Sequence, residues 1–375
     1  MNPLTRLVLL LVAAAGGLVV ALLGALQLLA PGVVADGVPP SLLAAWIGMP
    51  AAGAVAIAAG LAALAVAAVA LRERRSVTSR RMRTMLTLMA LVVALVVSTL
   101  TPGGTIPVAG YSFVLVLAAG VVATLVLLVI RRPVVGLVVV AAVAGGVVLV
   151  SLRLPTGLFA QMVVGGLAPR MPFLMIALAH LVTAGALVAW TVGAPPTAGR
   201  FDAWALRHRR PVTVAAALCA LPYVALRASW LTPWPLFGPA DVAEHPDVLL
   251  TGLLLGCAML TGGLLTLLLA LPWADRFPRW LGLVGGRAVP VALAVIPASV
   301  VGVLFTAGGI ELVVATAGSL GVLEVTLVFP FWLWGPLLVQ ATRGYALHRA
   351  ASADTTAAPS ERMPRPPAST ISEAA

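Results

Sequence analysis

The sequence predicts an all-α integral membrane protein with about ten transmembrane helices in one bundle. Of its 375 residues, 61% are hydrophobic and only 9% are charged, and the mean hydropathy is +1.11. A water-soluble domain carries roughly 25% charged residues because its surface faces water. A chain this poor in charge must present most of its surface to lipid, which excludes a soluble fold.

Long apolar runs give the number of helices. A spanning helix needs about 20 mostly apolar residues at about 1.5 Å each. The predicted spans are 7–30, 44–71, 85–101, 110–130, 133–152, 172–193, 211–231, 248–272, 289–309 and 319–341. The third run is short and the start of the tenth is blurred, so the expected range is about nine to eleven spans. The first run continues to Ala30, beyond the roughly 7–15-residue core of a signal peptide, so we expect it to remain as a span.

The arginines predict the orientation. All 23 basic residues are arginine, and cytoplasmic loops are enriched in positive charge. With the N-terminus inside, the cytoplasmic segments hold Arg6, the arginines of 72–83, 131–132, 200–210 and 276–287, and those from Arg343 onward, while the outer side holds Arg153, Arg170 and Arg227. We therefore expect a multi-pass plasma-membrane protein with both termini in the cytoplasm. Residues 1–342 form the predicted transmembrane domain, and residues 343–375, rich in Ala, Ser, Thr and Pro, form a predicted disordered cytoplasmic tail.

Composition and motif content argue against several function classes. The net charge is +11, but the arginines lie in short clusters between apolar stretches, so we expect no nucleic-acid partner. Cys219 and Cys257 lie in apolar runs without CxxC spacing, which argues against a disulfide framework or a zinc site. HExxH and phosphate-binding Walker motifs are missing. The sequence therefore assigns no catalytic residue, no metal ligand and no cofactor.

Four polar side chains in late spans form the predicted candidate pocket. A charged group at a helix centre costs about 2.5–3.5 kcal/mol on insertion scales and tends to be retained for a reason. Arg227 and Glu324 lie at matching depths, about 6–8 Å below the outer surface, so we expect an ion pair if their helices are neighbours. Tyr223 shares the helix face of Arg227, so it either orients the guanidinium or marks the membrane interface. His180, in the predicted span 172–193, is the fourth polar side chain of the candidate pocket. The structural alternatives are a snorkelling arginine and a histidine bonded to a neighbouring helix.

Three further features have both a functional and a structural interpretation. The stretch Phe329–Pro336 contains two prolines, so it predicts either a broken helix at a substrate site or simple packing. The GxxxG pattern at Gly252–Gly256 is typical of close helix packing. The outer segment 232–247 carries Asp241, Glu244, His245 and Asp247, but their spacing matches no helical zinc or EF-hand pattern, so we expect a solvated loop.

Several stretches in the second half of the chain carry a resemblance. They are Leu221–Arg227, Pro278–Leu281 with Gly285–Pro290, and Phe331–Pro336. The chain resembles uncharacterised polytopic membrane proteins of high-GC actinobacteria. This resemblance implies location and topology, and it implies no activity.

Three functions remain open at this level. The first is permease-like handling of a small solute or lipid at an outward-facing polar pocket. The second is a non-catalytic structural or regulatory membrane subunit, which would dock a membrane or cytoplasmic protein through residues 72–83 and the tail. The third is a membrane enzyme acting on lipid-linked substrates, which needs convergent carboxylates or a nucleophile–base pair. Membrane lipids are expected partners in every case.

Overall fold

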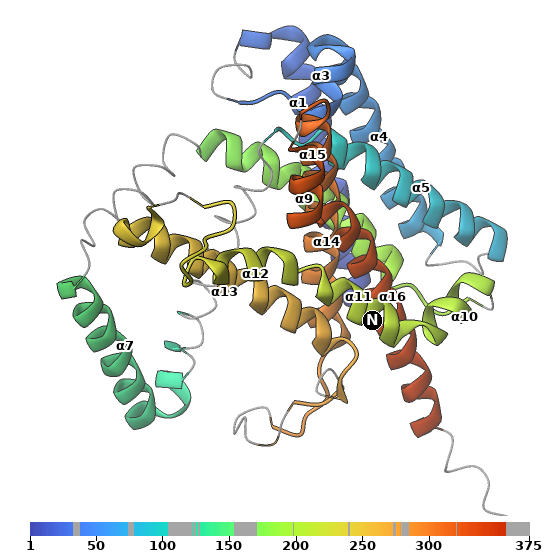
Figure 1. The fold of residues 1–375 in the computed structure, drawn as a ribbon. Coiled ribbons are helices and arrows are strands. Elements are labelled where there is room, and N and C mark those ends of the chain that lie inside the picture. The colour runs from blue at the N-terminus through green and yellow to red at the C-terminus, as the bar shows by residue number, and fades with distance from the viewer. Residues whose placement is uncertain are drawn as a thin grey trace, which may run out of the picture.

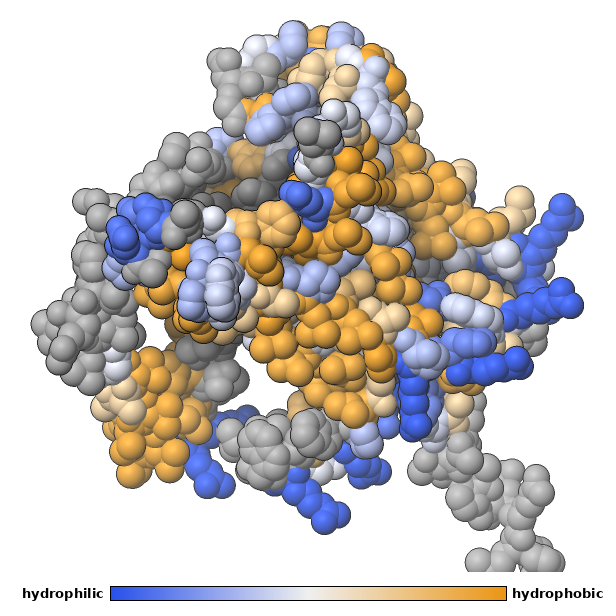
Figure 2. Space-filling view, viewed as in Figure 1, coloured by the Kyte–Doolittle hydropathy of each residue, from blue (hydrophilic) through white to orange (hydrophobic). Residues whose placement is uncertain are grey.

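The described part of the chain is a helical assembly of the membrane type. The computed structural model describes residues 1–32, 38–73, 79–103, 122, 125–126, 128–153, 171–197, 199–238, 241–272, 275–277, 279, 285–319 and 321–357. Among these residues the elements are helices, with two isolated β-bridges. Eight helical segments are long and apolar enough to cross a membrane, which confirms the all-α, multi-pass class. Apolar side chains cover most of the middle of the face shown in Figure 2.

The first half of the bundle is built on close contacts between small residues. Helix α1 (Pro3–Leu29) packs along α4 (Met49–Glu73) and α9 (Met171–Val192), and α5 (Arg80–Thr99) packs on α9. Gly17 of α1 faces the backbone of Gly60 in α4, and Gly24 faces Gly53. These glycines let the two backbones approach closely, as small residues do in membrane helix pairs.

The predicted second span is interrupted near its start. A short helix, α3 (Leu42–Ile47), ends at Gly48, where φ is 86°, and α4 begins at the next residue. Residues with a side chain avoid this left-handed backbone region, so a glycine at this position permits the break. The predicted run 44–71 is therefore two helices.

The second half contains two more interrupted spans. Its helices are α11 (Arg209–Leu218), α12 (Leu221–Ser229), α13 (Pro246–Leu268), α14 (Val291–Thr316), α15 (Val322–Val328) and α16 (Phe331–Ala357). The predicted span 211–231 consists of α11 and α12. The predicted span 319–341 is broken at Phe329, which has φ −117° and ψ 68°, just before Pro330, a residue without a backbone N–H. The prediction of a broken helix in 329–336 is thus confirmed at Phe329 and Pro330. The second proline, Pro336, lies inside α16 and does not end the helix.

The count of ten spans stays a prediction. The predicted span 110–130 lies largely outside the described residues. The predicted span 133–152 corresponds to α7 (Pro133–Arg153), which stands apart from the other helices in Figure 1 and is not among the eight candidates. Residues after α5 and residues of α9 line the same cavity, so the chain leaves α5 and enters α9 at one end.

The starts of α1 and α14 lie beside the C-terminal part of α16. Burial, followed by the charges of Arg6 and Arg349, lowers the pKa of the Met1 amino group, and Arg349 donates a hydrogen bond to the carbonyl of Val289.

Helix α16 runs on to Ala357, so the predicted domain boundary at residue 342 is wrong. Arg343, Tyr345 and Leu347 are buried, which explains why the helix continues. Residues 358–375 of the predicted tail lie outside the described residues.

Candidate functional site

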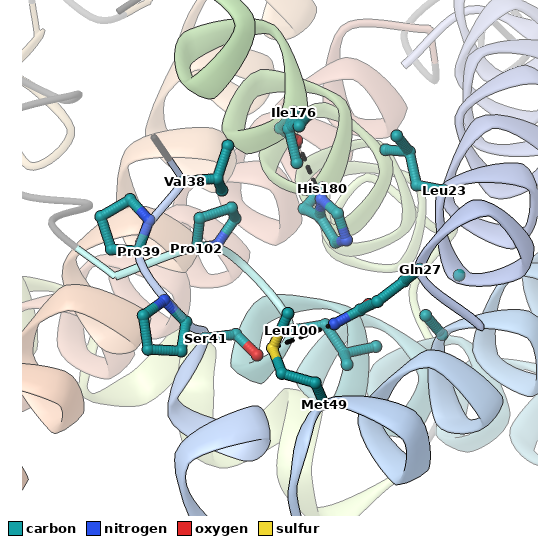
Figure 3. A pocket seen from close by; sticks show the side chains of 13 residues that line it. Leu23, Gln27, Val38, Pro39, Ser41, Met49, Leu100, Pro102, Ile176 and His180 are labelled. Atoms are coloured by element: carbon teal, nitrogen blue, oxygen red, sulfur yellow. Dashed lines mark hydrogen bonds between the residues drawn. The ribbon is translucent and has the colours of Figure 1, made fainter. Parts of the chain in front are cut away.

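A cavity of about 40 Å³ lies between α1, α4 and α9, beside α3 and at the opposite end from Met1 (Figure 3). Most of its walls are apolar or proline side chains. Its polar groups come from Gln27, Ser41 and His180, together with the thioether of Met49. None of the residues that line it is charged.

His180 presents one ring nitrogen to this cavity. Its side chain is 4% exposed, and Nδ1 lies 2.8 Å from the backbone carbonyl of Ile176. A carbonyl oxygen only accepts, so the neutral ring carries its proton on Nδ1 and leaves Nε2 as an acceptor. Figure 3 shows the other nitrogen turned toward the open centre of the cavity. The structural alternative expected a hydrogen bond from His180 to a neighbouring helix. Its partner is wrong, because the Ile176 carbonyl belongs to the same helix, α9.

Gln27 and Ser41 complete a neutral hydrogen-bonding lining. The Gln27 amide nitrogen lies 3.3 Å from the sulfur of Met49. Ser41 Oγ accepts from the backbone N–H of Ala44 at 3.1 Å and so caps α3. Among the described residues no further bond uses the Gln27 carbonyl oxygen or the Ser41 hydroxyl proton, so both can serve a molecule in the cavity.

Sequence reasoning missed Gln27, Ser41 and Met49. Gln27 carried a signal, because it is the one amide side chain in an otherwise apolar first span. Ser41 and Met49 lie at the edges of an apolar run, where such residues are common. Only the fold brings them opposite His180.

The cavity does not contain an assembled nucleophile–base pair. Ser41 and His180 both line it, but no hydrogen bond joins them in the part of the chain that the structure describes. A general base acts within about 2.6–3.2 Å of the proton it takes, directly or through one water. The other His180 nitrogen is held by a backbone carbonyl rather than by a carboxylate.

Tyr223 and Arg227 form a second polar feature on α12. Arg227 Nε donates a 2.8 Å hydrogen bond to the Tyr223 hydroxyl, which confirms that Tyr223 orients the guanidinium. The guanidinium carbon also lies 4.9 Å from the centre of the Tyr223 ring and 4.1 Å from that of Trp230. A cation over aromatic faces is stabilised by the ring quadrupole, more strongly where water is excluded.

The predicted ion pair between Arg227 and Glu324 is not formed in the described structure. Helices α12 and α15 are in contact, and the Tyr223 ring lies 5.0 Å from that of Phe329, so the expected neighbourhood is present. Glu324, however, is exposed in the first turn of α15. The depth estimate assumed one straight tenth helix, and the break at Phe329 removes that assumption.

The four predicted residues therefore do not share one pocket. His180 lies in the cavity of α1, α4 and α9, while Tyr223 and Arg227 lie against α13 and α15. On α13, Gly252 lies beneath the Trp230 ring and Gly256 beneath the Arg227 side chain. This contact confirms the packing interpretation of the GxxxG pattern.

The outer acidic segment and the comparisons add no chemical assignment. His245 Nδ1 lies 3.5 Å from a carboxylate oxygen of Asp241 on the surface, and no group of three or more possible His, Cys, Asp or Glu ligands occurs among the described residues. A scan of the models of known protein families, a search of curated proteins and a search of solved structures each found no match to this chain.

Proposed function

We propose that this chain is a permease-like plasma-membrane protein with an outward-facing binding cavity around His180. The observation that carries the proposal is the uncharged cavity between three candidate spans, whose mostly apolar walls carry three hydrogen-bonding side chains, Gln27, Ser41 and His180. Polar groups within a membrane bundle are costly, and those that line a cavity commonly mark a solute path. The arginine distribution supports placing the cavity end outside and the chain termini in the cytoplasm.

The lining favours a small uncharged solute that donates hydrogen bonds. A cavity of about 40 Å³ has room for roughly three water-sized groups, since each needs about 10–15 Å³. His180 Nε2 and the Gln27 carbonyl oxygen are available acceptors. An ionic solute would lose its hydration without meeting an opposite charge, which is a large penalty in this environment. Small amides and alcohols fit these requirements.

Non-helical backbone lines the end of the cavity that the arginine distribution places outside. Ser41 and Pro102 form an isolated bridge, and Gly103 N–H donates to the carbonyl of Pro40 at 3.2 Å. Irregular backbone at membrane depth is tolerated where it is buried in protein or lines a cavity.

A second candidate is a non-catalytic structural or regulatory subunit. The separation of His180 from Tyr223 and Arg227 favours it, because isolated polar contacts are typical of helix packing. The two candidates differ in whether the cavity conducts solute.

The test is solute flux in vesicles reconstituted with the full chain. Uptake of formamide, urea and glycerol is followed by stopped-flow light scattering for the unaltered protein and for His180→Phe, which fills the cavity. Arg227→Met is the control, since it leaves the cavity untouched. We expect flux above protein-free vesicles, retained in the control and lost in His180→Phe. Flux no higher than in protein-free vesicles for all three solutes would favour the structural candidate.

A further inference from the structure

Exposed arginines gather at the end of the bundle opposite the cavity. The first turns of α5 carry Arg80, Arg81 and Arg83, and α10 (Arg200–Arg207) carries an arginine at each end. All of these side chains are exposed. A terminal nitrogen of Arg80 lies 3.7 Å from the point that a side chain at Gly199 would occupy, so the two elements meet. Hydrophilic side chains project from this region on the right of Figure 2, where Figure 1 places α10 and the start of α5.

These arginines differ from the paired arginines of α16. Arg343 and Arg349 bind carboxylates and carbonyls, whereas the guanidinium groups of the five arginines on α5 and α10 have no hydrogen-bond or ion-pair partner among the described residues. The acid of α10, Asp202, is buried and held by Arg343. Glu73, at the end of α4, is the neighbouring acid in sequence. The surface therefore keeps a large excess of positive charge.

Helix α10 presents cations and aromatic rings on the face that is turned away from the rest of the bundle. Its inner residues, Asp202 and Ala205, are buried, and α10 packs on α16. Arg200, Trp204 and Arg207 follow i, i+4, i+7 spacing and so share a face. The side chain of Trp204 is 45% exposed and that of Phe201 is 62% exposed. Tryptophan rings are enriched at the headgroup level of a membrane, and basic side chains near the surface are attracted to anionic lipids there.

The lipid-facing stripe of α5 places its arginines at headgroup level. Met85, Leu88, Val92 and Leu95 are all more than half exposed and share one face at helical spacing. Arg81 lies one turn before Met85 on that face, about 6 Å along the axis. A side chain at this position is directed to the boundary between acyl chains and headgroups.

We propose that α5 and α10 form a binding surface for the phosphate of an anionic phospholipid in the leaflet at this end of the bundle. Arg80 and Arg200 are the central contacts. A guanidinium matches phosphate with two parallel hydrogen bonds, and Trp204 and Phe201 anchor the surface among the acyl chains. Lipids with a net negative charge are preferred, because the choline of a zwitterionic headgroup would face further arginines. The proposal does not depend on solute flux.

The test measures lipid affinity on the full chain in detergent. Phosphatidylglycerol and phosphatidylcholine are titrated separately, and bound lipid is counted by native mass spectrometry. The variant R80Q/R200Q is compared with R131Q/R132Q, which removes the same charge from the exposed pair at the start of α7. We expect phosphatidylglycerol affinity to fall about tenfold or more in R80Q/R200Q, since each basic residue near an anionic surface contributes about fivefold. The control and phosphatidylcholine binding should change little.

Three results would overturn the proposal. The first is unchanged phosphatidylglycerol affinity in R80Q/R200Q. The second is an equal loss in R131Q/R132Q, which shows general charge attraction. The third is competition by inorganic phosphate at the concentration at which the lipid binds, which assigns the site to a soluble anion. Trp204→Leu provides a further arm that keeps every charge, and it should weaken lipid binding while leaving inorganic phosphate binding unaffected.

Discussion

Arg343 of α16 and Asp202 of α10 form a two-point ion pair across 141 positions of sequence. Arg343 Nε lies 3.0 Å from one carboxylate oxygen, and Nη2 lies 2.7 Å from the other. The second oxygen also accepts from the backbone and hydroxyl of Thr197, while Arg343 Nη1 donates to the carbonyls of Val192 and Ala194. Both charged residues are buried. One guanidinium therefore joins α10, α16 and the end of α9.

Removing Arg343 should destabilise the protein strongly. Arg343→Met leaves the buried carboxylate of Asp202 without its cation, which costs about 3–5 kcal/mol in comparable pairs. The thermal midpoint of the detergent-solubilised protein measures the loss. Arg210→Met is the control, since Arg210 is exposed. The double change Arg343→Met with Asp202→Leu should recover part of the stability, because neither charge is then stranded. Equal midpoints for Arg343→Met and Arg210→Met would contradict this account.

The same pair predicts a loss of stability in acid. Burial by itself raises the pKa of Asp202, but the hydrogen bonds from Arg343 and Thr197 and the charge of Arg343 outweigh it, so the pKa lies below its ordinary value of 3.8. A lowered pKa stabilises the folded state above that ordinary value, and the stabilisation is lost as the pH falls through the lowered one. Thermal midpoints of the unaltered protein and Asp202→Asn should differ by a constant amount near neutral pH. The gap should narrow as the pH falls below 3.8 toward the lowered pKa, and a gap that keeps its neutral-pH size throughout that fall would contradict the prediction.

The apolar runs and arginine clusters predicted the class of fold well. A membrane helix must be long and apolar over its whole length, and this requirement is local in sequence. The predicted runs 7–30, 172–193 and 248–272 each correspond to one unbroken helix. Hydropathy cannot locate breaks, since the runs that contain Gly48 and Phe329 stay apolar when averaged over a whole span. Both breaks depend on backbone conformation instead.

The candidate site was only half predictable, and the reason is chemical. Charge and ring nitrogen were the signals that selected His180, Arg227 and Glu324, and the four-residue spacing from Arg227 added Tyr223. The cavity around His180 is completed by the amide of Gln27, the hydroxyl of Ser41 and the thioether of Met49, which are all far from His180 in sequence. The interaction between Tyr223 and Arg227 was predictable because it is local, four residues along one helix. The pairing with Glu324 depended on a straight tenth helix that does not exist.

A side chain at Gly335 should prevent the close contact between α14 and α16. A Cβ at this position would meet the backbone of Thr306 and the carbonyl of Gly302, so Gly335→Val forces the helices apart. Overpacking of this kind typically costs about 1–3 kcal/mol. Gly145→Val in α7 is the matched control, because nothing lies within 4 Å of its Cβ position. Thermal midpoint and monodisperse yield should fall for Gly335→Val only. A similar fall in both variants would indicate that the cost is one of helix propensity.

Cysteine labelling should place the cavity and the arginine surface on opposite sides of the plasma membrane. The loop between α12 and α13 lies on the predicted outer side, and its Trp234 is 78% exposed. Arg210 lies at the start of α11, on the predicted inner side. In a background lacking Cys219 and Cys257, a membrane-impermeant maleimide should label Trp234→Cys in intact cells and Arg210→Cys only after permeabilisation. Arginine is retained on the cytoplasmic side during insertion, and this bias fixes the expected sign. The reverse pattern would invert the bundle, place the His180 cavity in the inner half and leave the outward-facing permease proposal without its geometry.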